Sequence, residues 1–511
     1  MGSPDVRIPT ATLRGVEAVP VTVEVSVSGG IPGLSIVGMP DASVLEARSR
    51  VRCAIKACGY KIPRLHVTVN LAPAEIRKTG TAFDLPIAVA VLAATGQIPL
   101  DGLSGLLFVG ELALDGSVCP SRGAVAHAAL AEREGLSLAC SAQTRLPLGL
   151  STGAYGISAI SRLRAGVGEL PPLAADAAGT GGAGAPGAGG EGAPGAIERP
   201  DFSDVVDQDM AKRAMVIAAA GRHGMLMVGP PGSGKTMLAR RMPTILPPLT
   251  DAERSEAMLI HSVAGQPIAP LVRGERPFRA PHHSISMGGL VGGGRPVMPG
   301  EVSLAHGGVL FLDELPEFAS NVLQSLRQPM EDHEVRIVRV DGVYAFPCDF
   351  QLVAAANPCP CGHLGDDAQE CTCSPARVAA YQGRIGGPLM DRIDVVVDVH
   401  RPASTDVIRG SDGIGSAEML DQVMAAREFA SWREAREGAR HGMGARGVAG
   451  LGFQPDACAF FVDSAERLAL GGRGIARVGR VARTIADMDG HELVSRDDVG
   501  EALQYRSRRQ L

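Results

Sequence analysis

The stretch Gly229-Pro-Pro-Gly-Ser-Gly-Lys235-Thr236 matches the phosphate-binding pattern G-x-x-x-x-G-K-[ST]. The apolar residues 225–228 before it predict a short strand, and residues 237–241 after it predict the start of a helix, as the pattern requires. The glycines let successive backbone N–H groups face one centre, and the helix N-terminus adds a favourable dipole. We expect Lys235 to reach the terminal phosphates of ATP and Thr236 to offer its hydroxyl to Mg²⁺. The predicted ATP-binding loop comprises Gly229, Pro230, Pro231, Gly232, Ser233, Gly234, Lys235 and Thr236.

Two carboxylates end a second apolar run, residues 308–312. A first acid at a strand end, Asp313, can hold Mg²⁺, and a second, Glu314, can polarise the water that attacks the γ-phosphate. The alternative is that both acids begin a surface turn. The presence of Lys235 and Thr236 in the same chain favours the catalytic interpretation.

Two further polar residues follow apolar segments. Residues 350–356 predict a third strand that ends at Asn357, whose amide could orient the attacking water, although an asparagine before proline is also a common turn residue. Arg392 lies between Asp391 and Asp394. In a ring, Arg392 would enter the neighbouring site and neutralise phosphate charge, an effect worth about 10³-fold or more. Taken alone, such an arginine is more often part of a surface ion pair.

Four arginines near the C-terminus recur at helical spacing, so they share one helix face. They are Arg473, Arg477, Arg480 and Arg483. We expect Arg473, which follows the break at Gly471 and Gly472, to contact the nucleotide of its own subunit. For the others, a solvated or DNA-facing stripe is the expectation.

The length and pattern of the chain predict several domains. A chain of 511 residues suggests about three. Strand and helix patterns alternate up to about residue 170, and residues 21–27 alternate apolar and polar side chains as a half-buried strand does. Residues 174–196 are almost entirely Gly, Ala and Pro, which favours a flexible linker, and a break is expected near residues 410–415. The predicted division is an α/β domain at 1–172, a linker at 173–199, a nucleotide-binding α/β domain with a parallel sheet at 200–400 and a helical domain at 401–511.

Charge and hydropathy restrict the partners. The net charge of −6 gives no global attraction for nucleic acid or anionic membranes, so DNA contacts must come from local basic patches. No stretch approaches the ~18 apolar residues that span a bilayer, and no signal peptide opens the sequence. We expect a cytoplasmic protein without a membrane partner.

Four of the ten cysteines form the pattern C-x-C-x₉-C-x-C. Soft thiolates in two tight pairs can close a tetrahedral zinc site. Free surface thiols that occasionally oxidise are the alternative, but tight spacing in a cytosolic chain favours metal. The predicted Zn²⁺ ligands are Cys359, Cys361, Cys371 and Cys373.

These motifs, taken together, resemble the ComM/YifB family of magnesium-chelatase-like AAA+ ATPases over nearly the whole chain. The resemblance rests on the phosphate loop and on several segments specific to the family. These segments are Arg276-Pro-Phe-Arg-Ala-Pro-His-His283, Gly300-Glu-Val-Ser-Leu-Ala-His306, Val309-Leu-Phe-Leu-Asp-Glu-Leu315, Asn357-Pro-Cys-Pro-Cys-Gly362, Gly387-Pro-Leu-Met-Asp-Arg-Ile-Asp394, Val481-Ala-Arg-Thr-Ile-Ala-Asp487 and Tyr505-Arg506.

The resemblance implies a homo-hexameric AAA+ ring driven by ATP and Mg²⁺, with a helical lid at the C-terminus. It also implies an insert near residues 277–300, a hairpin near residues 335–346, and branch-migration helicase activity on DNA. In this scheme Asp313 and Glu314 are the metal and water carboxylates, and Asn357 is the sensor amide. Arg392 is the finger in trans and Arg473 the lid sensor.

The N-terminal region resembles the proteolytic domain of Lon through residues 33–40 and 70–80. A protease of that type needs a serine hydroxyl activated by a lysine amine. Ala82 stands where the serine would align and Val125 near the expected lysine, while Lys78 and Ser121 lie at other positions. We therefore expect an inert α/β domain that serves ring assembly or DNA engagement.

Nothing in the sequence resembles a helix-turn-helix or a zinc-finger array, so we expect no base-specific recognition of branched or single-stranded DNA. A translocating ring needs only backbone contacts from loops in its pore. For the histidine pair, a packed turn in which both rings find partners is an equal alternative. The candidate DNA contacts are Arg279, His282, His283, Arg295, Arg336 and Arg339. The rival functions are a magnesium-chelatase motor subunit that remodels a protein partner and an ATP-dependent Lon-like protease.

Overall fold

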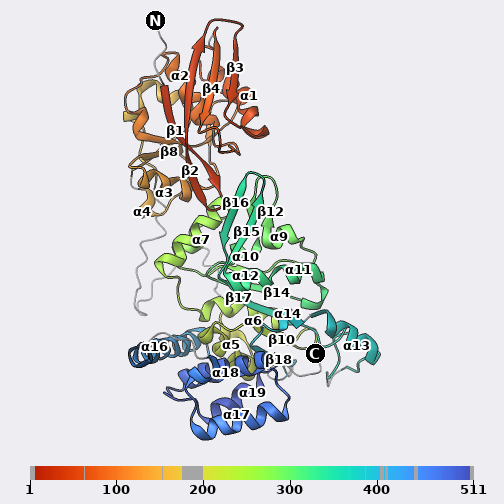
Figure 1. The fold of residues 1–511 in the computed structure, drawn as a ribbon. Coiled ribbons are helices and arrows are strands. Elements are labelled where there is room, and N and C mark those ends of the chain that lie inside the picture. The colour runs from red at the N-terminus through yellow and green to blue at the C-terminus, as the bar shows by residue number, and fades with distance from the viewer. Residues whose placement is uncertain are drawn as a thin grey trace.

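The computed structural model describes residues 6–506 except 63, 152, 175–199, 367–368, 386, 403–404, 406–407, 409–412 and 442–446. An N-terminal α/β part, a central parallel sheet with its helices and a C-terminal set of helices follow one another along the chain (Figure 1). The expected linker at 173–199 and the expected break near 410–415 lie largely outside the described residues. The domain boundaries therefore stay a prediction.

Alternation of buried and half-buried side chains shapes the first sheet. Strand β2 (Glu17–Ser28) buries alternate residues in its middle, as the pattern at 21–27 predicts. It pairs antiparallel with β1 (Val6–Arg14) and β4 (His66–Ala72), and β3 (Gly33–Val37) adds to β4 in parallel, giving the order β1-β2-β4-β3. Helices α1 (Ala42–Ala57) and α2 (Asp84–Ala94) cover this sheet.

A smaller parallel sheet completes the N-terminal part, in the order β5-β8-β9. Its strands are β5 (Leu106–Phe108), β8 (Ser137–Ser141) and β9 (Ala154–Ile157). The remaining elements are the short pair β6 (Glu111–Leu112) and β7 (Val118–Cys119), and the helices α3 (Ala124–Arg133) and α4 (Leu148–Ser151). The region is thus of the α/β class that its sequence pattern predicts.

The central sheet has five parallel strands in the order β11-β14-β17-β10-β18. Parallel strands have their carboxyl ends at one edge, where ligands of open α/β sheets bind. Because β17 lies between β14 and β10, residues that follow these three strands are neighbours. The strands are β10 (Met225–Val228), β11 (Phe278–Arg279), β14 (Val309–Leu312), β17 (Gln351–Ala356) and β18 (Val395–Asp398).

Helices pack against this sheet and extend from its edges. The first of them, α5, lies against β18 and is almost fully buried along one side. The helices of the central part are α5 (Asp209–Gly221), α6 (Lys235–Arg241), α7 (Asp251–Ala264), α8 (Ala269–Val272), α9 (Met287–Val291), α10 (Glu301–Leu304), α11 (Ser320–Ser325), α12 (Arg327–Asp332), α13 (Pro375–Gln382) and α14 (Gly387–Met390).

Two antiparallel ribbons project from the central part. The expected hairpin near residues 335–346 is present as β15 (Glu334–Arg339) and β16 (Gly342–Pro347). The short pair β12 (Gly292–Gly293) and β13 (Met298–Pro299) lies within the expected insert. The two ribbons are neighbours, since a Cβ placed on Gly292 would lie 3.3 Å from Ile337 Cδ1.

The C-terminal region is helical, as predicted. Within it, the carboxylate of Asp487 is buried and accepts hydrogen bonds from Arg433, with Arg483 Nη2 at 3.0 Å. The backbone N–H of Val396 in β18 donates to the carbonyl of Tyr505 at 2.8 Å, which ties the end of the chain to the central sheet. The helices are α16 (Ser416–His441), α17 (Pro455–Arg467), α18 (Gly472–Met488) and α19 (Arg496–Gln504).

The N-terminal part is packed against the central part through α3 and α7. The N–H of Gly123 donates to the Ser262 carbonyl at 2.9 Å, and the N–H of Val125 donates to Ser262 Oγ at 3.1 Å. One apolar cluster includes side chains from both parts. The turn between β1 and β2 meets the hairpin, where Gly15 contacts the backbone of Ala345 (Figure 1).

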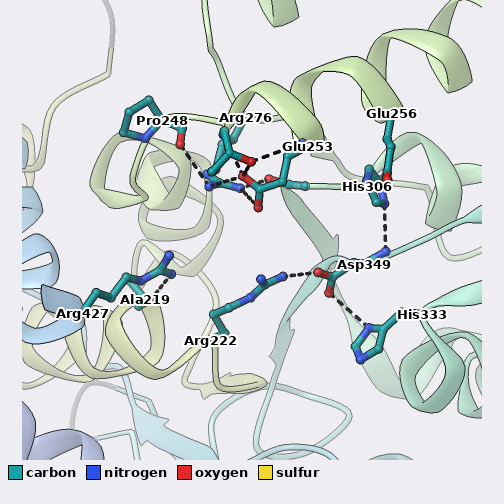
Figure 2. A network of polar contacts seen from close by, with 12 residues as sticks. Ala219, Arg222, Pro248, Glu253, Glu256, Arg276, His306, His333, Asp349 and Arg427 are labelled. Carbon is teal, nitrogen blue, oxygen red and sulfur yellow. Dashed lines mark hydrogen bonds and ion pairs between the residues drawn. The ribbon is translucent and has the colours of Figure 1, made fainter. Parts of the chain in front are cut away.

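A polar network connects α7 to the amino edge of the central sheet (Figure 2). Arg276 is paired with Glu253 of α7 at 3.2 Å and also donates to the carbonyl oxygens of Pro247, Pro248 and Gly307. Asp349, just before β17, binds Arg222 at 2.6 Å, while His333 lies 3.1 Å away and His306 accepts from the Asp349 N–H. Arg276, the first residue of the motif at 276–283, therefore has a structural role, because its ion pair and hydrogen bonds link the surrounding segments.

Candidate nucleotide site

The predicted phosphate loop lies at the carboxyl edge of the sheet, between β10 and α6. Gly232 and Gly234 have φ values of 78° and 91°, a conformation that favours glycine. A Cβ on Gly229 would overlap the carbonyl oxygen of Val399, which follows β18. Both constraints explain why the loop needs glycine at these points.

Lys235 lies inside the loop and is 8% exposed. Its Nζ donates to the carbonyl oxygens of Gly229 at 2.7 Å and Pro230 at 2.9 Å, and it lies 3.3 Å from Asn357 Oδ1. Burial lowers the pKa of this ammonium, while the charges of Asp313 and Glu314 oppose the shift. The ammonium thus sits at the centre of the loop, where a phosphate can replace its contacts with the carbonyls.

The two carboxylates after β14 point to different partners. Asp313 Oδ2 accepts a hydrogen bond from Thr236 Oγ1 at 2.7 Å. Hydroxyl and carboxylate oxygens are hard ligands of the kind that Mg²⁺ prefers, so this pair fits a magnesium ion. Glu314 has a φ of 51° and its Oε2 lies 3.4 Å from His283 Nδ1. A left-handed glutamate is unusual, and such strained residues cluster at functional sites.

Sheet order explains why the predicted residues converge. Asn357 follows β17, which lies between the strand that precedes the phosphate loop and the strand that precedes Asp313. Its amide oxygen therefore meets Lys235, although the two residues are 122 positions apart. Lys235, Thr236, Asp313 and Asn357 form one connected polar group, and Glu314 adjoins it.

Arg392 lies at the opposite, amino edge of the sheet. It precedes β18, whose Val395 is in register with Met225 at the start of β10. The Arg392 guanidinium is paired with Glu331 of α12, and burial, Arg327 and Arg473 lower its pKa. The strand β10 therefore separates Arg392 from the phosphate loop of the same chain.

Arg473 is also found at the amino edge. Its guanidinium is paired with Asp391, and side chains of Arg392 and Arg473 line a common cavity of about 650 Å³. Arg480 contacts Asp394 at 2.8 Å, whereas Arg477 donates to the Ile393 carbonyl at 3.2 Å. This placement differs from the expectation that Arg473 contacts its own nucleotide. The reason is that α18 begins beside the segment before β18, at the edge away from the loop.

The candidate DNA contacts divide into two groups. Arg279 forms a two-pronged ion pair with Glu301, at 2.6 and 2.8 Å, so its guanidinium is already engaged within the fold. His283 faces Glu314, and its ring lies 4.0 Å from that of His282, which bonds Ser284 Oγ at 2.8 Å. His283 and the neighbouring His282 thus lie beside Glu314 of the nucleotide site, whereas Arg279 lies in β11 at the edge of the sheet.

The other three candidates lie on the projecting ribbons. Arg295 is exposed in the turn between β12 and β13, and Arg339 is exposed at the end of β15. Arg336 is exposed as well but is paired with Glu334 at 2.9 Å. The apolar side chains of Val338 and Val340 are also exposed at this tip, Val338 by 73%.

The four predicted metal-binding cysteines come together beside the phosphate loop. Their sulfur atoms all lie within 4.8 Å of one another. The backbone N–H groups of His363 and Thr372 donate to Cys361 and lower the pKa of its thiol to about 5. The sequence pattern thus predicted a real spatial cluster.

Lys78, the lysine in the segment that resembles Lon, is shielded from solvent. Lys78 is fully buried, its Nζ donates to the Pro73 carbonyl, and burial lowers its pKa. No hydrogen bond among the described residues joins it to Ser121. This arrangement gives no support to a serine–lysine pair at these positions.

Two residues were not assigned their structural roles from the sequence. Glu331 pairs with Arg392, and His283 was grouped with DNA contacts although it faces Glu314. The sequence held one usable signal, because His283 follows β11 by only four positions and so had to lie close to the carboxyl edge. For Glu331 we find no such signal.

Comparisons of the sequence with known proteins identify its relatives. The chain matches the family described as magnesium chelatase, subunit ChlI, at residues 201–407, with further matches to subunit ChlI of Mg-chelatase at 23–143 and to the ChlI C-terminal region at 413–506. It is 39% identical to the protein YifB of Salmonella typhimurium, over 98% of this chain and 96% of that protein. YifB of Escherichia coli and competence protein ComM of Haemophilus influenzae are each 38% identical, over 98% and 96% of this chain and 96% of each relative.

Proposed function

This chain belongs to the ComM/YifB family of magnesium-chelatase-like AAA+ proteins, and on that premise we propose that it is an ATP-hydrolysing ring motor that moves along DNA. Membership of the family supports an AAA+ ATPase-like motor that uses ATP and Mg²⁺. The ring, the DNA substrate and helicase activity are the further steps of the proposal.

The proposal of a ring rests on the separation of the candidate site residues between the two edges of the central sheet. Lys235, Asp313 and Glu314 lie at the carboxyl edge of the sheet, whereas Arg392 and Arg473 lie at the amino edge. Stacking one subunit's amino edge on the next subunit's carboxyl edge would complete each site. Repeating this head-to-tail contact closes a ring when the rotation between neighbouring subunits divides evenly into a full turn. We propose a homo-hexamer, with both arginines supplied in trans.

The residues of one chain have separable roles in hydrolysis. Lys235 binds the terminal phosphates, and Asn357 orients the attacking water. Glu314 accepts the proton of that water as it attacks. Thr236 and Asp313 would hold Mg²⁺, which neutralises charge on the phosphate oxygens when bound. Arg392 from the neighbouring subunit would stabilise charge on the transferring phosphate.

The two neighbouring ribbons support DNA as the polymer that is moved. Arg295 and Arg339 place exposed cationic groups on them, beside exposed Val338 and Val340. Cationic loops that contact phosphates bind nucleic acid without reading its sequence. The hairpin also contacts the β1–β2 turn of the N-terminal part, so its movement can be passed to that part.

The test is ATP hydrolysis with and without DNA, combined with strand displacement on a four-way junction. We expect DNA to stimulate ATP hydrolysis. We also expect the strands of the junction to be separated only in the presence of ATP. Hydrolysis without either DNA effect would reject the DNA motor.

A second function, remodelling of a protein partner by a magnesium-chelatase-like motor, is favoured by the matches to subunit ChlI along the chain. In that case hydrolysis would be insensitive to DNA and would respond to the partner protein. The same assay therefore separates the two functions. A Lon-like protease is disfavoured because Ala82 and Val125 stand where its catalytic serine and lysine would align.

A further inference from the structure

The cysteine cluster beside the phosphate loop has the dimensions of a metal site. The Sγ atom of Cys359 lies 3.4 Å from that of Cys361 and 3.7 Å from that of Cys371, and the sulfurs of Cys361 and Cys371 are 3.6 Å apart. A tetrahedral zinc ion with zinc–sulfur bonds of about 2.3 Å requires sulfurs about 3.8 Å apart. The fourth sulfur, of Cys373, lies within 4.8 Å of the others.

We propose that Cys359, Cys361, Cys371 and Cys373 bind one zinc ion, and that this ion holds the loop that positions Asn357 against the phosphate loop. Four thiolates form a soft ligand set that selects zinc over magnesium or calcium. All four cysteines are free, and their sulfur distances exceed the roughly 2.05 Å of a disulfide.

The cluster is attached directly to the catalytic residues. Cys359 follows Asn357 by two positions, and the amide of Asn357 accepts from Lys235. Movement of the first cysteine pair therefore moves the amide that orients water.

The same loop packs against the phosphate loop from outside. Gly362, which follows the first cysteine pair, approaches Pro231 so closely that a Cβ there would lie 2.5 Å from the proline Cδ. Asp366 is bonded by His363 at 3.0 Å and lies 3.7 Å from Arg401, which donates to the Pro231 carbonyl at 3.1 Å. Outside the cluster, Gln382 of α13 donates to the Pro358 carbonyl at 3.0 Å.

Few apolar side chains hold this loop, so a metal would be its main support. Cys359 is buried, but the other three cysteines are only half-buried, and most of the described residues between the two pairs are exposed. Small loops without a core of their own commonly depend on a structural metal. Zinc would thus act as a positioning element and would not take part in the chemistry.

The first experiment measures metal in the full-length protein purified without chelator. We expect about one zinc per chain by elemental analysis, released when a mercurial reagent modifies the thiols. Growth with cobalt should give the absorption of a tetrahedral cobalt–thiolate centre. Protein without zinc, or with iron or a disulfide in its place, would overturn the assignment. This result is independent of whether DNA is the substrate.

The second experiment tests positioning with the double variant Cys371→Ser/Cys373→Ser, which leaves the pair next to Asn357 in place. We expect loss of zinc and a fall in kcat for ATP hydrolysis of about tenfold or more, because small displacements of positioning groups are costly. The Kd for a fluorescent ATP analogue should change by less than about threefold. Cys458→Ser, at an exposed cysteine of α17, is the matched control and should retain zinc and kcat.

Circular dichroism and gel filtration show whether the double variant folds. A folded, zinc-free variant with wild-type kcat would reject the positioning role. If the variant is misfolded, slow removal of zinc from the wild-type protein by a chelator gives the same test, with re-addition of zinc as the check. Loss of kcat that zinc restores supports the proposal, and unchanged kcat after complete removal overturns it.

Discussion

At the residue scale, the backbone of Glu314 is the most informative detail of the site. Its backbone is left-handed, with φ of 51°, and its side chain faces His283, whereas the Asp313 carboxylate contacts Thr236. Two adjacent acids therefore serve different partners. Holding glutamate in this conformation costs of order 1 kcal/mol, so the surrounding fold must impose it.

The substitution Glu314→Gln tests this division of roles. Removing the base should lower kcat for ATP hydrolysis by about 10²- to 10⁴-fold, the usual contribution of general-base catalysis, while ATP binding persists. Glu317→Gln is the control, because Glu317 lies one turn further on and is paired with Arg384 at 3.6 Å. Equal losses in the two variants would contradict the assignment.

The proposed trans role of Arg392 is tested by mixing subunits. Arg392→Ala should bind ATP but lose turnover by about 10³-fold or more, and Lys235→Ala should lose ATP binding. Mixed rings contain some sites with an intact Lys235 on one side and an intact Arg392 on the other, so activity should partly return. Mixed rings, verified by mass spectrometry, that stay inactive would return Arg392 to the role of an ion-pair partner of Glu331.

The sequence predicted Lys235, Thr236, Asp313 and Asn357 together because each follows a strand, and parallel strands bring such positions to one edge. The sequence could not predict the ion pair between Arg279 and Glu301, because an ion pair between residues 22 positions apart depends on how two loops pack. The nearness of His283 to Glu314, in contrast, follows from its position four residues after β11.

At the scale of elements, the two ribbons project from the central part and expose cationic and apolar side chains. The hairpin β15–β16 carries its apolar residues outward at the tip, which a purely structural hairpin would not require. Its existence was predicted from the family resemblance. Its contacts with β12 and with the N-terminal β1–β2 turn were not predicted, because packing between distant elements leaves no periodic signal.

The double variant Arg295→Ala/Arg339→Ala is expected to reduce stimulation of ATP hydrolysis by DNA while leaving hydrolysis without DNA unchanged. Loss of two phosphate contacts should change how the DNA association constant depends on salt. The slope of its logarithm against the logarithm of the salt concentration should be less steep by about 2 for duplex DNA. Arg467→Ala, at an exposed pair with Asp463 on α17, serves as the control. Unaltered DNA stimulation and salt dependence would show that the ribbons do not bind DNA.

At the scale of the whole molecule, the parallel sheet and the helical C-terminal region agree with the sequence-based fold class. Among the described helices, none combines the length and apolar character needed to cross a bilayer. The position of Arg473 could not be predicted, because it depends on how α18 docks beside β18. The packing of α3 on α7 could not be predicted either, because the sequence pattern of a helix does not show which element covers its buried side chains.

A buried histidine in α3 should make stability sensitive to acid. His127 of α3 is fully buried, and burial lowers its pKa from 6.5 to about 4. Between these values the unfolded chain binds more protons than the folded chain, so stability falls as pH drops from about 6.5 towards 4. The total loss is about 3 kcal/mol, and it is constant below pH 4.

Chemical unfolding of the wild-type protein and His127→Leu at several pH values measures this effect. The variant should lose about 2 kcal/mol less than wild type between about pH 7.5 and 5. His282→Gln, at an exposed histidine, should keep the wild-type slope. Identical pH profiles for all three proteins would show that His127 does not titrate differently in the two states.

The placement of Lys235 and Arg392 at opposite edges of one sheet has a consequence for regulation. On the proposed arrangement, an isolated chain does not hydrolyse ATP. The rate of hydrolysis per chain depends on how many chains are assembled with it. Dilution would act as an off switch, and specific activity would rise more steeply than linearly with concentration. ATP would thus be hydrolysed only where subunits have already assembled.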